Sequence, residues 1–182
     1  MKLALLRALV VVVLVLSIAS PSQGFDGFLR IDGVKGESTD QRYRDWIAVT
    51  AVGWGHQLPV ATRADGGGAA VSRVHFQPLA VSKFLDSTSP HLAQYAADGR
   101  VIRQVFLDLV QGPGQPPFSR LELQDVVITS YAVEGAAGSP QRPVEKLSFT
   151  FGRINWGSVA VQPDGRPGEV KSGWDVRMNQ KF

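Results

Sequence analysis

The chain has 182 residues, of which 44% are hydrophobic and 19% are charged, and it contains no cysteine. The absence of cysteine excludes disulfides, thiolate metal sites and cysteine nucleophiles. A formal net charge of only +3, without a cluster of Lys and Arg, argues against a nucleic-acid partner, because such binding requires that several phosphates be neutralised.

The first residues have the pattern of a secretory leader. Lys2 and Arg7 give a positive start, and an almost uninterrupted apolar run follows from Ala8 to Ile18. This run has about half the length that a membrane-spanning helix needs, so a cleaved signal peptide is favoured over an uncleaved strand or an anchor. Cleavage is expected after Gly24, with a second fitting site after Ala19.

A single domain is expected after the leader. Subtracting the 24 residues of the leader from 182 leaves 158, residues 25–182, which is an ordinary domain size. Because Lys2 and Arg7 leave with the leader, 17 basic residues then face 16 acidic ones, and the mature chain is nearly neutral. Without disulfides, an exported domain of this kind has to be stabilised by packing or by association with other subunits.

The first half of the mature chain is predicted to form strands. One strand begins at Phe25, almost directly after the leader. The segment 47–54 is apolar on both faces, which is expected of a single strand that is covered on two sides.

One short helix is predicted over residues 90–98. Ser89 would cap its N-terminus, Pro90 would occupy its first position, and Gly99 would end it. Its apolar face would consist of Leu92, Tyr95 and Ala96. Because two helical turns are marginal alone, this helix must pack on a sheet or across an opening of one.

The second half of the chain returns to strand patterns in the segments 101–110, 119–133 and 144–156. In the second of these segments, one face carries Leu121, Leu123, Val127 and Tyr131, while the other turns apolar at Val126 and Ile128. In the third, the apolar face consists of Leu147, Phe149 and Phe151. The expected fold is therefore mainly β, a compact β-barrel or two-sheet sandwich with one short α-helix.

No catalytic or metal-binding pattern stands out. The three histidines, His56, His75 and His91, lack the spacing of metal ligands on a helix, and no G-x-S-x-G elbow occurs. The glycines at 66–68 are not followed by the Lys and Ser/Thr of a phosphate-binding loop. We expect neither enzyme activity nor a cofactor.

Apolar residues are more abundant than one small barrel interior requires. Several strands are apolar on both faces, and such a surplus favours assembly, because large exposed apolar patches mark interaction sites. Four tryptophans could serve the core or an interface, where Trp is enriched, and both roles stay open. They are Trp46, Trp54, Trp156 and Trp174.

Six segments of the chain, taken in order, indicate a protein family more specifically than any one of them does alone. They are FLRIDGVKGESTD, IAVTAVGWGHQ, HFQPLAVSKFLDSTSPHLAQYAADGRVIRQVFLDL, LELQDVVITSYAVEG, PVEKLSFTFGRINW and GWDVRMN. Together they resemble the Hcp family (haemolysin-coregulated protein), the tube protein of type VI secretion systems, over essentially all of residues 25–182. The motif residues are Asp32, Gly33, Gly36, Glu37, Ser89, Pro90, Gly99 and Trp174.

The resemblance implies a structural protein without catalysis or cofactor. Family members fold as a β-barrel of two sheets with one helix and form hexameric rings. These rings stack into a hollow tube, which can carry small effector proteins and is propelled by a contractile sheath. The resemblance also implies that the loop from Gln57 to Ala70 helps neighbouring rings meet. Its candidate stacking residues are Arg63, Asp65, Gly66, Gly67 and Gly68.

The leader conflicts with the usual role of such a tube. It predicts a periplasmic or secreted protein, whereas the family assembles in the cytosol before secretion. The alternative function is therefore an exported Hcp-like binding module that does not form a secretion tube. A hydrolase on a β-sandwich scaffold is a third hypothesis, because a fold alone does not define a function.

Overall fold

The structure is a computed structural model that describes residues 24–61, 70–161 and 167–182. Its elements are β1 (Asp26–Ile31), β2 (Ile47–Val49), β3 (Ala51–Gln57), β4 (Val60–Ala61), β5 (Ala70–Val71), β6 (His75–Phe84), α2 (Ser89–Asp98), β7 (Ile102–Val110), β8 (Ser119–Glu134), β9 (Val144–Thr150), β10 (Arg153–Val161), β11 (Pro167–Asp175) and β12 (Gln180–Lys181). The expectation of a mainly β chain with one short helix is confirmed. Within these ranges no helix has the length and apolar character needed to cross a membrane.

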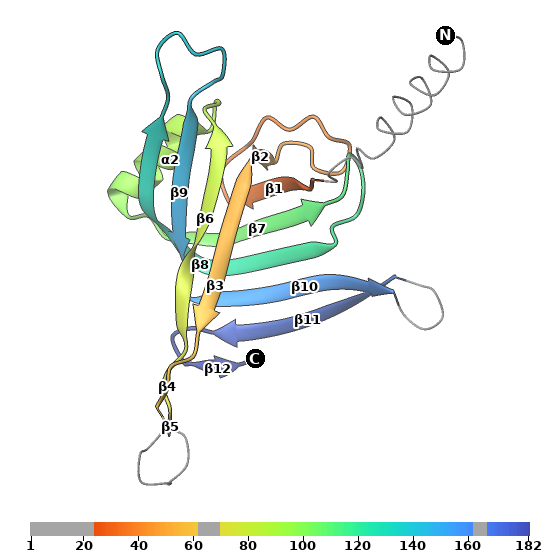
Figure 1. The fold of residues 1–182 in the computed structure, drawn as a ribbon, viewed down its shortest axis with the longest axis vertical. Coiled ribbons are helices and arrows are strands. Elements are labelled where there is room, and N and C mark those ends of the chain that lie inside the picture. The colour runs from red at the N-terminus through yellow and green to blue at the C-terminus, as the bar shows by residue number, and fades with distance from the viewer. Residues whose placement is uncertain (1–23, 62–69, 162–166) are drawn as a thin grey trace, which may run out of the picture.

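Two antiparallel sheets share the long strand β8 (Figure 1). The first sheet has the order β12-β11-β10-β8-β7-β1-β2, and the second has the order β3-β6-β9-β8. In β8, residues 119–126 pair with β7 and residues 119–124 pair with β10 on the other side, whereas residues 127–134 pair with β9. The short β4–β5 hairpin projects away from both sheets (Figure 1).

Strand β8 bends at Asp125, where it leaves the first sheet and enters the second. Asp125 has a positive φ of 54°. The amide of Gly152 donates to the carbonyl oxygens of both Gln124 (2.9 Å) and Asp125 (3.2 Å), which fixes the bend against the turn between β9 and β10.

Because of this bend, the alternation of buried and exposed residues in β8 differs from the predicted one. Leu121 and Leu123 are buried as predicted, but the next buried residues are Val126 and Ile128 rather than Val127. The left-handed backbone at position 125 shifts the alternation by one residue. An irregularity of register between Ile128 and Ser130 then shifts it back, so Tyr131 packs against the core.

The core lies between the two sheets, and α2 closes it beside β8. Leu92 on α2 has no exposed surface, and Tyr95 and Ala96 pack against the core, which confirms the predicted helical face. The predicted face of β9 is confirmed as well. Its members are Leu147, Phe149 and the adjoining Phe151, all of which are buried.

The start of the helix differs from the prediction. The N-cap is Thr88 rather than Ser89, and Ser89 is the first helical residue. The amide of Thr88 donates to the carboxylate of Asp86 (2.8 Å), while the Ser89 hydroxyl accepts from the Asp86 amide (3.0 Å). Ser89 therefore supports the turn before the helix instead of capping it. Gly99 ends the helix in the left-handed conformation, with a φ of 64°, as predicted.

The predicted strand over residues 47–54 is wrong in one respect, because it is divided at Thr50. The amide and the hydroxyl of Thr50 both donate to the carbonyl oxygen of Ser82 (2.7 and 3.1 Å). At this point the chain leaves the first sheet and enters the second. The segment is not covered on two sides, since Ala48, Ala51 and Trp54 are exposed.

The loop of residues 32–46 folds over the outer face of the first sheet. The ring of Tyr43 stacks on Phe28, with 4.4 Å between centroids, and meets Trp46 edge-on at 5.2 Å. The amide of Gly36 donates to the carbonyl oxygen of Asp45 (2.8 Å). A Cβ atom at position 36 would collide with the backbone carbonyl of Trp46, so this close approach requires glycine.

We expect Gly36→Ala to destabilise the protein, by at least the roughly 1–3 kcal/mol that overpacking costs, because backbone rather than a flexible side chain would have to move. Gly53→Ala is the matched control, since nothing lies within 4 Å of a Cβ atom there. Urea unfolding of both variants measures the difference. Equal unfolding midpoints would show that the loop adjusts without cost.

Candidate functional site

The second sheet ends in two strands that pair on one side only. Among the described residues, β3 pairs with β6 alone, and residues 127–134 of β8 pair with β9 alone. The unpaired N–H and C=O groups of such edges are a template for another chain. Each edge carries an exposed apolar side chain, since Trp54 is 36% exposed and Val133 is 47% exposed. The sheet thus offers two different edges to a neighbour.

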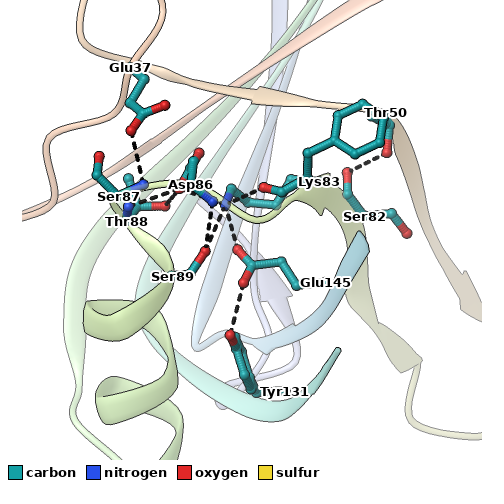
Figure 2. A network of polar contacts seen from close by, with 11 residues as sticks. Glu37, Thr50, Ser82, Lys83, Asp86, Ser87, Thr88, Ser89, Tyr131 and Glu145 are labelled. Carbon is teal, nitrogen blue, oxygen red and sulfur yellow. Dashed lines mark hydrogen bonds and ion pairs between the residues drawn. The ribbon is translucent and has the colours of Figure 1, made fainter. Parts of the chain in front are cut away.

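A buried ion pair joins the two inner strands of this sheet (Figure 2). Lys83 on β6 and Glu145 on β9 are direct partners in the strand register, and both side chains are 0% exposed. The Lys83 ammonium donates to one oxygen of Glu145, and the hydroxyl of Tyr131 on β8 donates to the other oxygen (2.9 Å). The pair therefore holds β6, β9 and the edge strand β8 together.

The same ammonium also fixes the beginning of the helix. Lys83 Nζ lies 2.8 Å from the carboxylate of Asp86 and donates to the carbonyl oxygen of Phe84 (2.9 Å). The ammonium also contacts the hydroxyl of Ser89, at 3.5 Å. Figure 2 shows these groups converging on Nζ from the strand and from the first turn of α2. Such a set of partners is what a buried charge requires.

Burial and the hydrogen-bond partners in this cluster shift the pKa values of Tyr131 and Asp86 in opposite directions. Burial, together with the hydrogen bond to Glu145 and the negative charge there, raises the pKa of Tyr131 to about 12, so its hydroxyl remains a donor. Burial alone would raise the pKa of Asp86, but hydrogen bonds from Lys83 and Thr88 outweigh it and hold that pKa below 3.8. Asp86 therefore remains a carboxylate beside Lys83 at neutral pH.

This buried cluster was not predicted from the sequence, although the alternation of residues in β6 and β9 contains a signal for it. Lys83 follows Leu79 and Val81 on the inward face of β6, and Glu145 precedes Leu147 on the inward face of β9. Opposite charges at inward positions of two strands indicate a buried pair.

The motif residues near the start of the chain shape two turns. Asp32 accepts a hydrogen bond from the Arg103 guanidinium (3.2 Å), and Gly33 has a φ of 81° in the turn after β1. The carboxylate of Glu37 accepts the amide of Ser87 (2.9 Å), which ties the loop of residues 32–46 to the helix start. The hydrogen bonds from Ser87 hold the pKa of Glu37 below its usual value.

The remaining predicted residues fall into three groups. Pro90 lies exposed in the first turn of α2, and Trp174 packs partly buried against the core, as Trp156 does. Trp46 packs against a small apolar cluster, formed by Phe28, Tyr43 and Val110, that is separate from the core between the sheets. The stacking candidates Arg63, Asp65, Gly66, Gly67 and Gly68 lie outside the described residues, as does the leader up to residue 23. In the described ranges no group of three His, Asp or Glu side chains could hold a metal ion.

Comparison with known proteins gives one consistent family. Residues 28–157 match the family model described as "Type VI secretion system effector, Hcp". Over 159 residues the chain is 30% identical to protein hcp1 of Pseudomonas aeruginosa, which covers 85% of this chain and 96% of that protein. A solved type six secretion system protein is 28% identical with a TM-score of 0.80, over 87% of this chain and 100% of that one. Hcp1 of Salmonella typhimurium, at 24% identity and a TM-score of 0.70, covers 87% and 99% and shares the fold.

We expect removal of one partner of the buried pair to destabilise the protein strongly. Lys83→Met leaves the Glu145 carboxylate buried without its cation, which typically costs about 3–5 kcal/mol. The double variant Lys83→Met with Glu145→Leu removes both charges and should recover a large part of that loss.

Urea unfolding of the two single variants and the double variant measures the coupling. Lys146→Met is the control, because Lys146 on β9 forms an exposed pair with Glu134 on the neighbouring strand β8, and such pairs contribute at most about 1 kcal/mol. Equal losses for Lys83→Met and Lys146→Met would contradict the assigned role of the buried pair.

Proposed function

The chain belongs to the Hcp family of type VI secretion proteins, and we propose that it is a structural tube protein without catalytic activity. Six copies close into a ring, and rings stack into a hollow tube. The observation that carries this proposal is the pair of unlike free edges on the second sheet.

Two unlike edges support a ring rather than a symmetric dimer. If the β3 edge of one copy lies against the β8 edge of the next copy, each contact is head-to-tail, and closure leaves neither edge exposed. Trp54 and Val133 would then be covered. The Tyr131–Glu145–Lys83 chain of hydrogen bonds supports this arrangement, because it holds the β8 edge rigidly to the inner strands.

The β4–β5 hairpin is the proposed contact between rings. It projects from the body of the protein, as Figure 1 shows, and its strands pair through Val60 with Val71 and Ala61 with Ala70. The segment that joins them contains Arg63, Asp65 and the glycines Gly66–Gly68. A glycine-rich connection suits a contact that has to adapt to its partner.

The leader and the partners are part of the proposal. We infer export of a domain comprising residues 25–182 after cleavage of residues 1–24, with effector proteins in the lumen and other secretion components as partners. An exported binding module that forms no tube is the alternative, favoured by the signal-peptide pattern between Lys2 and Gly24.

Native mass spectrometry of the protein from cells expressing the full-length gene tests ring formation and cleavage together. We expect a hexamer for the wild type and monomers for Val133→Lys, because a charge would be buried in the proposed contact. Val170→Lys on β11 is the control, since Val170 is 62% exposed and lies in the other sheet. A processed wild-type monomer would overturn the tube and favour the binding module.

We expect Arg63→Glu to spare the rings and weaken their stacking, because it reverses a charge in the proposed contact between rings. Negative-stain electron microscopy of purified rings distinguishes single rings from stacks. Arg100→Glu is the control, since Arg100 follows the helix and is not in the hairpin. Stacking of Arg63→Glu rings as readily as the wild type would disprove the assignment of this loop.

A further inference from the structure

An open hollow of about 580 Å³ lies on the outer face of the first sheet, where β1 and β7 meet the loop of residues 32–46. Four cationic side chains line it, against two carboxylates, those of Asp32 and Asp45. The cations are Arg30, Lys35, Arg44 and Arg103. This local excess of positive charge occurs in a chain whose mature form is nearly neutral, and ring formation through the second sheet makes no use of it.

Two of the four cations have carboxylate partners within the hollow. Lys35 pairs with Asp45 at 3.5 Å, and Arg103 pairs with Asp32 at 3.2 Å. In the part of the chain that the structure describes, no carboxylate lies within ion-pair distance of the other two, Arg30 and Arg44, which are both exposed. The hollow therefore keeps two positive charges available to a ligand.

Aromatic rings hold one of these charges in place. Arg30 and Phe106 are direct partners in the register of β1 and β7, and the Arg30 guanidinium lies 4.4 Å from the Phe106 ring centroid. The Trp46 ring lies 5.4 Å from the same guanidinium. A guanidinium that stacks through its planar face keeps its N–H edge for bidentate binding of a carboxylate or phosphate.

The packing under the loop fixes these rings before any ligand arrives. Trp46 contacts Tyr43 edge-on, and the close approach of Gly36 to the Trp46 backbone holds the loop closed. Because Arg30 is already positioned, little side-chain freedom remains to be lost on binding.

We propose that this hollow binds an acidic segment of a partner protein, with one carboxylate placed between Arg30 and Arg44. Asp32 and Asp45 favour this ligand over nucleic acid or a polyphosphate, because two carboxylates beside the cations repel a dense run of phosphates. A peptide carries one charge on each acidic side chain, so its carboxylate brings less negative charge near Asp32 and Asp45 than a run of phosphates does. The site is on the first sheet and does not depend on the proposed ring.

Fluorescence anisotropy with a labelled Glu-rich peptide, on the full assembled protein, tests the proposal. We expect Arg30→Gln and Arg44→Gln each to weaken binding about tenfold, since each removes a charge-assisted contact. Arg30→Lys keeps the charge but loses the planar guanidinium. Its affinity for the peptide should lie between those of Arg30→Gln and the wild type. Lys181→Gln on β12 carries the same change of charge outside the hollow and should bind like the wild type.

Three outcomes would overturn the proposal. Lys181→Gln could weaken peptide binding as much as the arginine variants do, which would mean non-specific attraction, or Arg30→Gln and Arg44→Gln could both bind the peptide like the wild type. The third outcome is that pyrophosphate or single-stranded DNA binds more tightly than the peptide. Circular dichroism and native mass spectrometry of each variant check the fold and the assembly separately, so loss of the ring cannot be mistaken for loss of the hollow. If Arg30→Gln fails to fold, Arg44→Gln decides alone, because Arg44 is on the loop and makes no stacking contact with Phe106 or Trp46.

Discussion

The architecture depends on one strand, β8, that serves two sheets. Residues 119–124 are paired on both sides and lie within the first sheet, whereas residues 127–134 are paired on one side and form an edge of the second. The bend at Asp125, fixed by the Gly152 amide, separates these two halves. The same bend therefore creates the space for the core and leaves the edge that a neighbouring copy can use.

The ion pair of Lys83 and Glu145 adds specificity more than stability. Taking two charges out of water costs about as much as their attraction returns, so an apolar pair of similar volume could stabilise the sheet equally well. A slip of one residue between β6 and β9, however, would turn one of the two charges to the opposite face of the sheet and leave the other buried alone. The pair thus favours one register, and through Ser89 and Asp86 it also fixes where the helix begins.

Sequence patterns predicted features that depend on neighbouring residues, such as strand faces and helix ends. They missed features that depend on contacts between distant segments. Alternation identified the buried face of β9, and Gly99 marked the helix end, because both signals lie within a few residues. The assignment of Ser89 as a cap failed, since its hydroxyl is used by the turn before the helix and by the buried Lys83. The edges and the basic hollow depend on pairings such as β1 with β7, whose partners are far apart in sequence.

The proposed contacts between subunits and the proposed ligand site lie on different sheets, so both can be occupied at once. In the proposed ring, subunits meet through the edges of the second sheet, and that contact does not use the outer face of the first sheet, where the loop of residues 32–46 and Phe106 position Arg30. A single carboxylate on an open, solvent-exposed hollow binds weakly, because surface ion pairs are screened by water and salt. In the proposed ring each hollow is repeated six times at fixed spacing, so a partner with several acidic segments would bind far more tightly than one segment does. Assembly would then strengthen binding without being required for it, because a monomer can hold one acidic segment whereas the ring can hold several segments of one partner at once.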